Sequence, residues 1–339
     1  MRRISNSQSS EERAFLWSSC VQTTSRCRTA KVRLGFLFAL ASILLACTGL
    51  SAQTSTIAAR LGYPTDSKLL IIHADDLAVA HSVDTASFAA LDQKAVSSAS
   101  VMVPCPWLTE VAEYAKSHPD ADVGLHLTLN SEWKTYRWGP VAPKDQVPSL
   151  LSPDGYLFGE EEGFQTHAKA DEVEREIRAQ VEQAMKLGIH PTHLDSHMGS
   201  LFLNPDLFRV YVKVAHDYKL PFLAVRVSDD RSKLLSLLSD KDIVLDSLVI
   251  FDPRVPPDEW TESYVKALRS LKPGLHEMIV HLGHDDSELE AVTVDHPDYG
   301  AAWRQRDFNA VTSPEFKKAL GENHIILLGW KDLKKPSVM

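Results

Sequence analysis

The chain has 339 residues, of which 44% are hydrophobic and 24% are charged, and its formal net charge is −9. This composition excludes a disordered chain, and the length predicts one large α/β domain, or two small ones, with a well-formed core. The acidic balance argues against a nucleic acid partner, because a polyanion is bound by a basic surface.

Residues 1–52 have the pattern of an export signal rather than of a folded element. They contain seven basic and two acidic residues, and residues 34–53 carry no charge. The apolar part is slightly shorter than the ~20 residues that a bilayer span requires, which favours cleavage over a retained anchor. Ordinary cleavage near Ala52 and lipidation at Cys47, in a segment that resembles a bacterial lipoprotein signal, both stay open. Either outcome predicts an exported bacterial protein, periplasmic or held at the membrane by an N-terminal lipid.

Residues 53–67 are expected to form a linker, and residues 68–335 a single domain. Without residues 1–52, the chain has 29 Lys and Arg against 43 Asp and Glu, a net charge of −14. Cys105 is the only cysteine in the expected domain, so neither a structural disulfide nor a cysteine-type zinc cluster is predicted. A homodimer is compatible with these observations.

From about residue 68 onward, short apolar runs alternate with amphipathic stretches, which is typical of parallel βαβ units. Eight apolar runs predict strands, at residues 69–73, 98–103, 122–127, 192–196, 222–227, 247–251, 277–282 and 325–328. Eight such runs favour a closed barrel over an open sheet. The predicted fold class is therefore α/β, a (β/α) TIM-like barrel with mostly parallel strands.

Apolar residues also recur at helical spacing between the later strands. They predict one helix from a cap at Asp171 to Gly188, a second that begins at Pro205, and a third across residues 260–271. The long irregular stretch 130–169 is rich in Trp, Tyr, Pro and Gly. Its length and composition predict a lid-like or substrate loop over the barrel mouth.

Three predicted strands end in residues that bind metal ions. Asp75 and Asp76 follow the first strand, His126 lies near the end of the third, and His197 follows the fourth. The carboxyl ends of the strands carry the chemistry in (β/α) barrels, so we expect one Asp and both His residues to hold a divalent ion. The other Asp is then free to act as a base, and which Asp takes which role stays open. Each residue alone also has a structural interpretation, since Asp pairs often cap helices.

His193, Asp195 and His197 lie on one face of the fourth strand, because side chains alternate along a strand. Four residues of strand span about 13 Å, which is too far for both histidines to bind one ion without a bend. His197 is therefore the better ligand, and His193 is predicted to be an interior histidine. Asp195 is predicted to orient a ligand or to balance the charge of the ion. Gly124, on the same face as His126, leaves room beside that ligand.

His281 ends the seventh predicted strand, where it could serve as a general acid for a leaving group. The alternative is a buried structural histidine. A ligand set of one Asp and two His with open positions can bind a water and lower its pKa toward neutrality. The sequence therefore predicts a hydrolytic metal site.

Several segments, in this order and spacing, resemble the YdjC-like carbohydrate deacetylases. Each motif alone is weak, but the ordered set is specific. The segments are Ile72-His73-Ala74-Asp75-Asp76-Leu77, Gly124-Leu125-His126-Leu127-Thr128, His193-Leu194-Asp195-Ser196-His197 and Val280-His281, with further likeness at residues 100–104 and 304–308. The resemblance covers about residues 68–334. It implies a distorted (β/α) barrel that removes acetyl groups from N-acetylated sugars, including chito-oligosaccharides.

By position, the resemblance implies that Asp76, His126 and His197 are the metal ligands, that Asp75 is the catalytic base and that His281 is the acid. The family's metal is usually described as magnesium, whereas two His and one carboxylate suit zinc better. We therefore expect one divalent ion, Mg²⁺ or Zn²⁺.

The predicted function is that of a metal-dependent hydrolase of linear amide bonds, acting on a small N-acetylated sugar or a sugar-bearing lipid. Aromatic residues could stack on the apolar faces of sugar rings, although plain loop packing is an equal alternative for each. The candidates are Trp107, Trp133, Tyr136 and Trp138, with Arg137 as a polar contact. A non-catalytic exported barrel that binds a glycan or glycolipid is a second hypothesis. A metal-dependent phosphoesterase is a third, which the acidic charge and the lack of a second complete ligand set disfavour.

Overall fold

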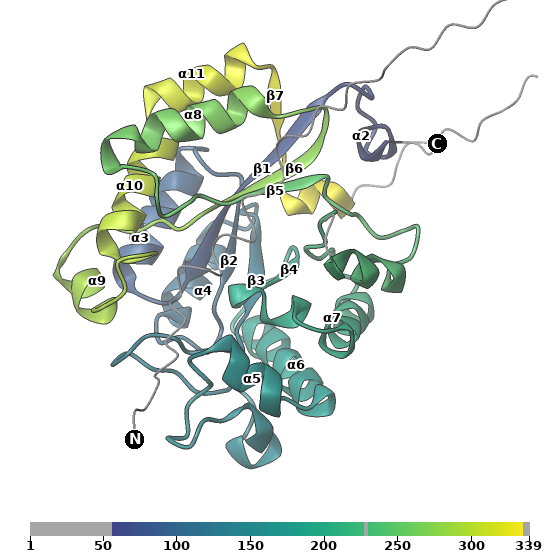
Figure 1. The fold of residues 1–339 in the computed structure, drawn as a ribbon, viewed down its shortest axis with the longest axis vertical. Helices are drawn as coiled ribbons and strands as arrows, with labels where there is room; N and C mark the ends of the chain where they lie inside the picture. Colours follow the sequence, from purple (N-terminus) through teal and green to yellow (C-terminus); the bar gives the residue numbers. More distant parts are fainter. Residues whose placement is uncertain (1–55, 227–229, 335–339) are drawn as a thin grey trace, which may run out of the picture. The chain divides into compact units, whose positions relative to one another are not determined.

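The computed structural model describes residues 56–226 and 230–334, so the predictions for the export signal and for Cys47 lie outside the described residues. A curled sheet occupies the centre, and helices surround it (Figure 1). Its strands are β1 (Lys68–Leu77), β2 (Ser98–Val101), β3 (Val123–Leu127), β4 (Leu194–Ser196), β5 (Ser247–Val249), β6 (Gly274–Val280) and β7 (Ile325–Leu327).

The strand order is β4-β3-β2-β1-β6-β5, with β7 paired to β1 off this path, and every one of these pairings is parallel. Two single parallel bridges join the ends of the sheet, from Leu194 in β4 to Phe222 and from Val225 to Leu245, just before β5. The predicted α/β barrel with mostly parallel strands is therefore confirmed. The predicted strand at 222–227 is wrong in its described part, because this segment makes only these isolated bridges.

Ten described α-helices cover the sheet. They are α2 (Ile57–Arg60), α3 (His81–Asp92), α4 (Leu108–Ser117), α5 (Glu161–His167), α6 (Ala170–Lys186), α7 (Pro205–Tyr218), α8 (Trp260–Ser270), α9 (Ser287–Val292), α10 (Ala301–Val311) and α11 (Pro314–Glu322). Short 3₁₀ helices are η1 (Lys144–Gln146), η2 (Pro148–Leu150), η3 (His197–Phe202), η4 (Asp230–Leu237), η5 (Pro257–Glu259) and η6 (Trp330–Lys334). Helices α6 and α7 pack together, as do α8, α10 and α11 (Figure 1).

The three helices predicted from periodicity are confirmed as α6, α7 and α8. Pro205 is the first residue of α7, and Asn204 before it accepts hydrogen bonds from two backbone N–H groups of the first turn. Asp171 is not the cap of α6, because that helix already begins at Ala170. Among the described residues, no helix combines the length and the apolar character needed to cross a membrane.

The two faces of β1 explain how the core is divided. Leu70 and Ile72 belong to the large apolar cluster that the helices pack against. Leu69 and Ile71 point the other way, into a smaller buried cluster with Trp330 of η6. Side chains alternate along a strand, so the face of Leu69 and Ile71 continues with a polar residue, His73, toward the carboxyl end. Helix α2, in the stretch expected to be a linker, adds a buried Ala58 to the smaller cluster.

Candidate metal centre

The end of β1 brings two neighbouring carboxylates into one site. Adjacent side chains of a regular strand point to opposite faces, which would separate Asp75 from Asp76. Here the pairing with β2 is irregular between Ala74 and Leu77, and Asp76 has a left-handed φ of 71°. Ala78 follows with a φ of 75°. Such conformations are costly for residues other than glycine and concentrate at functional sites. Both carboxylates are buried, at 5% and 4% exposure.

Three potential ligand atoms converge from β1, β3 and the start of η3. Oδ1 of Asp76 lies 3.3 Å from Nε2 of His126 and 3.5 Å from Nδ1 of His197. All three residues are buried, and their ligand atoms lie within 4.8 Å of one another. Oδ1 of Asp76 has no hydrogen-bond partner. A buried carboxylate oxygen without a partner is costly, and a divalent ion between these atoms would satisfy it. The residues therefore fit the metal ion that the sequence predicts.

Each candidate ligand is held from behind by a charged group. Nδ1 of His126 lies 2.7 Å from Oδ1 of Asp195, and Nε2 of His197 lies 3.0 Å from Oε2 of Glu132. Nη2 of Arg304 donates to Oδ2 of Asp76 at 2.7 Å. Carboxylates behind ligand histidines fix the tautomer and the ring orientation. His126 is thereby set to bind through Nε2 and His197 through Nδ1.

The backbone after β4 separates His197 from the residues before it. Met198 and Gly199 in η3 both have left-handed conformations, with φ of 53° and 66°.

His193 stays in the interior, where its ring stacks on Trp330 with centroids 5.0 Å apart. A Cβ atom on Gly124 would lie 2.3 Å from Cε1 of His193. The space at Gly124 is thus filled by the ring of His193, rather than left open beside His126.

Asp75 and His281 face the same space as the candidate ligands. Oδ2 of Asp75 lies 3.9 Å from Nε2 of His126 and 3.8 Å from Nε2 of His281. The backbone N–H of His281 donates to Oδ2 of Asp307, whose carboxylate also accepts from Trp260. Burial lowers the pKa of His281 to about 4, aided by Arg304, although the charges of Asp76 and Asp75 oppose this shift. His281 is therefore neutral at pH 7.

Electrostatics in the ligand set favour protonated histidines beside an ionised carboxylate. Burial works to lower the pKa of His197, but Glu132 and Asp76 raise it to about 9. Burial likewise works against the charge of His126, yet Asp75 and Asp195 hold its pKa well above the usual range. Burial works to raise the pKa of Asp76, and Arg304 and the two histidines hold it well below. A metal ion must therefore displace protons from both histidines.

Two other buried sets could also offer ligands, namely His73 with His193 and Asp195, and Asp75 with His126 and Asp195. Nε2 of His73 already lies 3.0–3.1 Å from oxygens of Asp195 and Asp75. Nδ1 of His126 is likewise engaged by Asp195. The set with Asp76 is the one that combines an unpartnered oxygen with two inward-facing ring nitrogens.

The aromatic residues of the long stretch are mostly packed inside the fold. Trp133 and Trp138 are 3% and 4% exposed, and the OH of Tyr136 donates to the carbonyl of Val79 at 2.8 Å. Arg137 donates to the carbonyl of Leu157 at 2.8 Å. Trp107 is the most exposed of the five candidates, at 37%. Its backbone N–H bonds the carbonyl of Ala78, next to the candidate centre.

Sequence reasoning missed three residues that hold the centre together. Glu132 lies in the irregular stretch, where no periodicity points to its contact with His197. Arg304 and Asp307 lie in the segment 304–308, which carries a family resemblance but no strand-end signal. Arg304 and Asp307 reach the site from α10, far away in the sequence, whereas Glu132 reaches it from the segment just after β3.

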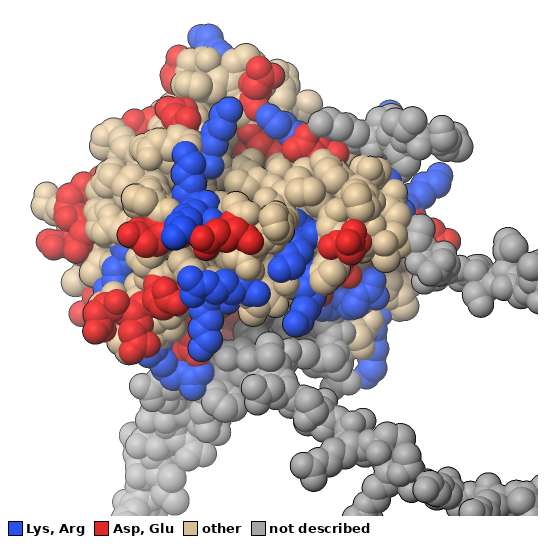
Figure 2. All heavy atoms as spheres, turned by 90° about the horizontal axis from the view of Figure 1, so that it is seen from above, with Lys and Arg blue, Asp and Glu red and all other residues tan. Residues whose placement is uncertain are grey.

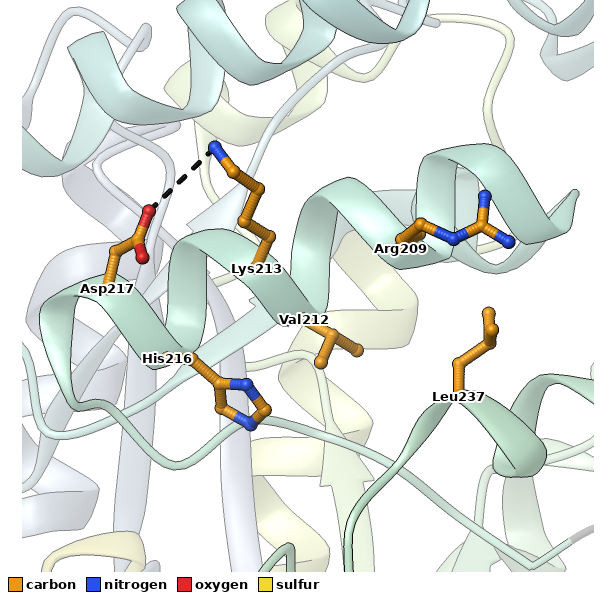
Figure 3. A pocket seen from close by; sticks show the side chains of 6 residues that line it. All are labelled: Arg209, Val212, Lys213, His216, Asp217 and Leu237. Atoms are coloured by element: carbon orange, nitrogen blue, oxygen red, sulfur yellow. Dashed lines mark ion pairs between the residues drawn. The ribbon is translucent and has the colours of Figure 1, made fainter.

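A separate surface hollow of ≈ 480 Å³ lies beside α7 and η4 (Figure 3). Its described lining residues are Arg209, Val212, Lys213, His216, Asp217 and Leu237. The charged groups there are paired, as Lys213 is with Asp217 and His216 with Asp242. No candidate site residue lines this hollow among the residues that the structure describes. On the face seen in Figure 2, Lys and Arg side chains are interspersed with Asp and Glu.

The fold and the donor set define an α/β barrel with a candidate single-metal centre of the kind that hydrolases use. A family model described as YdjC-like protein matches residues 69–322. A carbohydrate deacetylase of Thermus thermophilus is 32% identical over 274 residues, covering 79% of this chain and 94% of the relative. One from Enterococcus faecalis is 28% identical, covering 79% of this chain and 98% of the relative. The chain belongs to the YdjC-like family.

A solved structure supports the same fold. It is a protein of Enterococcus faecalis that carries the provisional name cellobiose-phosphate cleavage protein. It is 27% identical to this chain with a TM-score of 0.68, and the match covers 79% of this chain and 99% of that one.

Proposed function

We propose that this protein is a metal-dependent hydrolase that removes acetyl groups from N-acetylated sugars. The observation that carries the proposal is the convergence of Asp76, His126 and His197 beside a further buried carboxylate, Asp75. The names of the relatives, carbohydrate deacetylases, support a sugar as the substrate.

Asp76, His126 and His197 would hold a divalent ion, which when bound supplies a Lewis acid for the acetyl oxygen and lowers the pKa of a water. Two nitrogens and one carboxylate oxygen form a donor set that zinc accepts, and magnesium is the family expectation. Glu132 and Asp195 orient the two histidines for either ion.

Asp75 is the proposed base. One of its oxygens, Oδ1, is engaged by His73 and Ser100, which leaves Oδ2 directed toward His126 and His281. Asp75 takes a proton from the attacking water as the new C–O bond forms. His281 then protonates the departing amine nitrogen as the C–N bond breaks. Because burial keeps His281 neutral, its proton comes from Asp75, 3.8 Å away, so the proton removed from water ends on the amine.

Trp107 is the proposed stacking platform for a sugar ring, since stacking needs an accessible aromatic face. Its ring lies 5.0 Å from that of His81, which is bonded to Glu110 at 2.9 Å. Buried Trp138 instead lies edge-on to the ring of His197, and Trp133 packs against Trp138. A direct sugar contact stays a prediction for both.

The deciding experiment is acetate release from chitobiose and other acetylated sugars by the metal-loaded chain, beside Asp75→Asn and His126→Ala. Metal-dependent release that both variants abolish supports the proposal. Stoichiometric metal with no release from any sugar would sink the sugar assignment, and a generic phosphate ester serves as the comparison substrate. A protein that binds no metal and releases no acetate would favour a glycan-binding barrel.

We propose on the sequence of residues 1–52 alone that the protein is exported, and that it is then either free in the periplasm or held at the membrane by a lipid at Cys47. Cell fractionation of the full chain beside Cys47→Ala tests it. Membrane attachment that the variant loses would support lipidation, whereas a cytosolic location for both would contradict export.

A further inference from the structure

A fully buried histidine lies one pleat below Asp75 on β1. His73 is 0% exposed, and both of its ring nitrogens have close polar neighbours. Nε2 lies 3.0 Å from Oδ2 of Asp195, 3.1 Å from Oδ1 of Asp75 and 3.0 Å from Oγ of Ser100. Nδ1 lies 3.0 Å from Oγ of Ser98. Barrel interiors are ordinarily packed with branched apolar residues, so this polar centre requires a reason.

The contacts of Nε2 determine where one proton is. An ionised carboxylate has no hydrogen to donate and can only accept. Nε2 faces oxygens of both Asp75 and Asp195, so it carries a hydrogen that it shares between them. Ser100 completes the arrangement, because its hydroxyl donates to Oδ1 of Asp75 at 3.4 Å.

The contacts of Nδ1 determine where a second proton is. Ser98 has a single hydroxyl hydrogen, and its Oγ lies 3.2 Å from Oδ1 of Asp122 as well as 3.0 Å from Nδ1 of His73. Burial works to raise the pKa of Asp122, but His193 and other donors lower it, so this carboxylate is an acceptor. The hydrogen of Ser98 therefore goes to Asp122, and Ser98 in turn accepts from Nδ1 of His73.

The charges around the ring agree with two ring protons. Oε1 of Glu277 on β6 lies 4.0 Å from Nδ1, and neither oxygen of Glu277 has a hydrogen-bond partner. The ring of His193, just before β4, lies edge-on, with centroids 5.0 Å apart. Burial works to lower the pKa of His73, but the hydrogen bonds to Asp195 and Asp75 hold it well above the usual range. Glu277 contributes less, and burial raises its own pKa to about 7.

We propose that His73 is a permanently protonated imidazolium inside the barrel that positions Asp75 and Asp195 together. It fixes Oδ1 of Asp75, which leaves Oδ2 for the reacting water. It also fixes Oδ2 of Asp195, which leaves Oδ1 for Nδ1 of His126. One buried ring thus couples the proposed base to the orientation of a metal ligand. The role of Asp75 as a base rests on the proposed function, whereas the protonation state of His73 does not.

The test is ¹⁵N NMR of the full chain labelled at histidine, with zinc bound, and His73→Gln assigns the His73 signals. We expect both ring nitrogens of His73 to carry hydrogen from pH 6 to pH 9 with no titration. A bare Nδ1, or a titration within that range, would overturn the inference. If His73→Gln does not fold, Ser98→Ala supplies the assignment, because it alters the environment of Nδ1 and keeps the ring.

A second measurement asks whether the ring acts on catalysis. The amide of His73→Gln can still donate to carboxylates but carries no charge, so kcat should fall about 10- to 100-fold with KM within about twofold. His167→Gln, an exposed residue of α5, is the matched control and should leave both unchanged. A variant with unaltered kcat would refute the positioning role. An inactive parent with an intact imidazolium would count against the proposed function alone.

Discussion

The two ends of the barrel interior are built from the same strands but have opposite chemistry. Toward its amino end, β1 contributes Leu69 and Ile71 to a buried apolar cluster, and β6 adds Leu275. Toward its carboxyl end, β1 contributes His73 and Asp75, and His281 follows β6. Burying polar and charged groups costs free energy, whereas burying apolar groups stabilises the fold. The apolar end therefore stabilises the barrel, and the polar end holds the buried polar groups that the proposed chemistry uses.

Asp75→Asn is expected to have the largest effect at the polar end. Loss of the base should reduce kcat by about 100- to 10,000-fold, and the melting temperature should fall because the imidazolium of His73 loses one of its two carboxylate partners. Steady-state acetate release and thermal unfolding measure the two quantities. Asp206→Asn, at an exposed carboxylate in α7, is the control. Near-normal turnover in Asp75→Asn would remove this residue from the mechanism.

Leu275→Ala should do the reverse at the apolar end. Leu275 is 0% exposed, so truncation leaves a cavity and should lower the free energy of unfolding by about 2–5 kcal/mol. Denaturant unfolding checks this, with Met185→Ala, 47% exposed, as the control. Activity per folded molecule should be unchanged. A specific loss of activity without destabilisation would contradict the division between the two ends.

Metal affinity should rise with pH at the polar end. The ligand nitrogen of His197 must be bare to bind, and in the metal-free protein its pKa is raised to about 9. Between pH 7 and pH 9 the competing proton is progressively lost, so affinity should increase by about tenfold per pH unit for each proton released. Calorimetric titration with zinc in buffers of different ionisation enthalpy measures both quantities. An affinity independent of pH would exclude protonated histidines as the ligands.

Glu132→Gln should weaken zinc binding by about 10- to 100-fold, because a neutral amide no longer holds the ring of His197 as a carboxylate does. The same calorimetric titration measures it. Glu113→Gln, whose side chain is 78% exposed, should bind zinc like the parent. Equal affinity in Glu132→Gln would mean that the long stretch does not support the centre.

Trp107→Ala should have the smallest effect, at the mouth rather than in the interior. Loss of one stacking contact of about 1 kcal/mol corresponds to about a fivefold increase in KM, with kcat little changed. Kinetics on chitobiose and on a longer oligosaccharide measure it. An unchanged KM for both substrates would leave the ring without a role in sugar binding.

The parts of the site that strand ends supply could be predicted from sequence. Asp75, Asp76, His126 and His197 follow apolar runs, and parallel strands bring such ends together. Glu132 could not be predicted, because an irregular stretch has no period from which its position follows. The position of the His193 ring in the space beside Gly124 could not be predicted either. A pattern along one strand does not say which neighbouring side chain enters such a space.

The fold, like the site, could be predicted only in part from the sequence. Eight apolar runs predict strands, and seven of them form β1 to β7, whereas the run at 222–227 makes only single bridges in its described part. Composition predicts a buried, extended segment, whereas a ladder also requires neighbours that stay in register over several residues. Between β4 and β5 the neighbours diverge after one bridge on each side.

Anomalous diffraction from zinc-loaded crystals would test the central claim most directly. We predict one strong peak at about 2.0–2.2 Å from Oδ1 of Asp76, Nε2 of His126 and Nδ1 of His197. A peak deeper in the barrel between His73, His193 and Asp195, with none at the Asp76 set, would contradict both the metal centre and the protonated His73 beneath it.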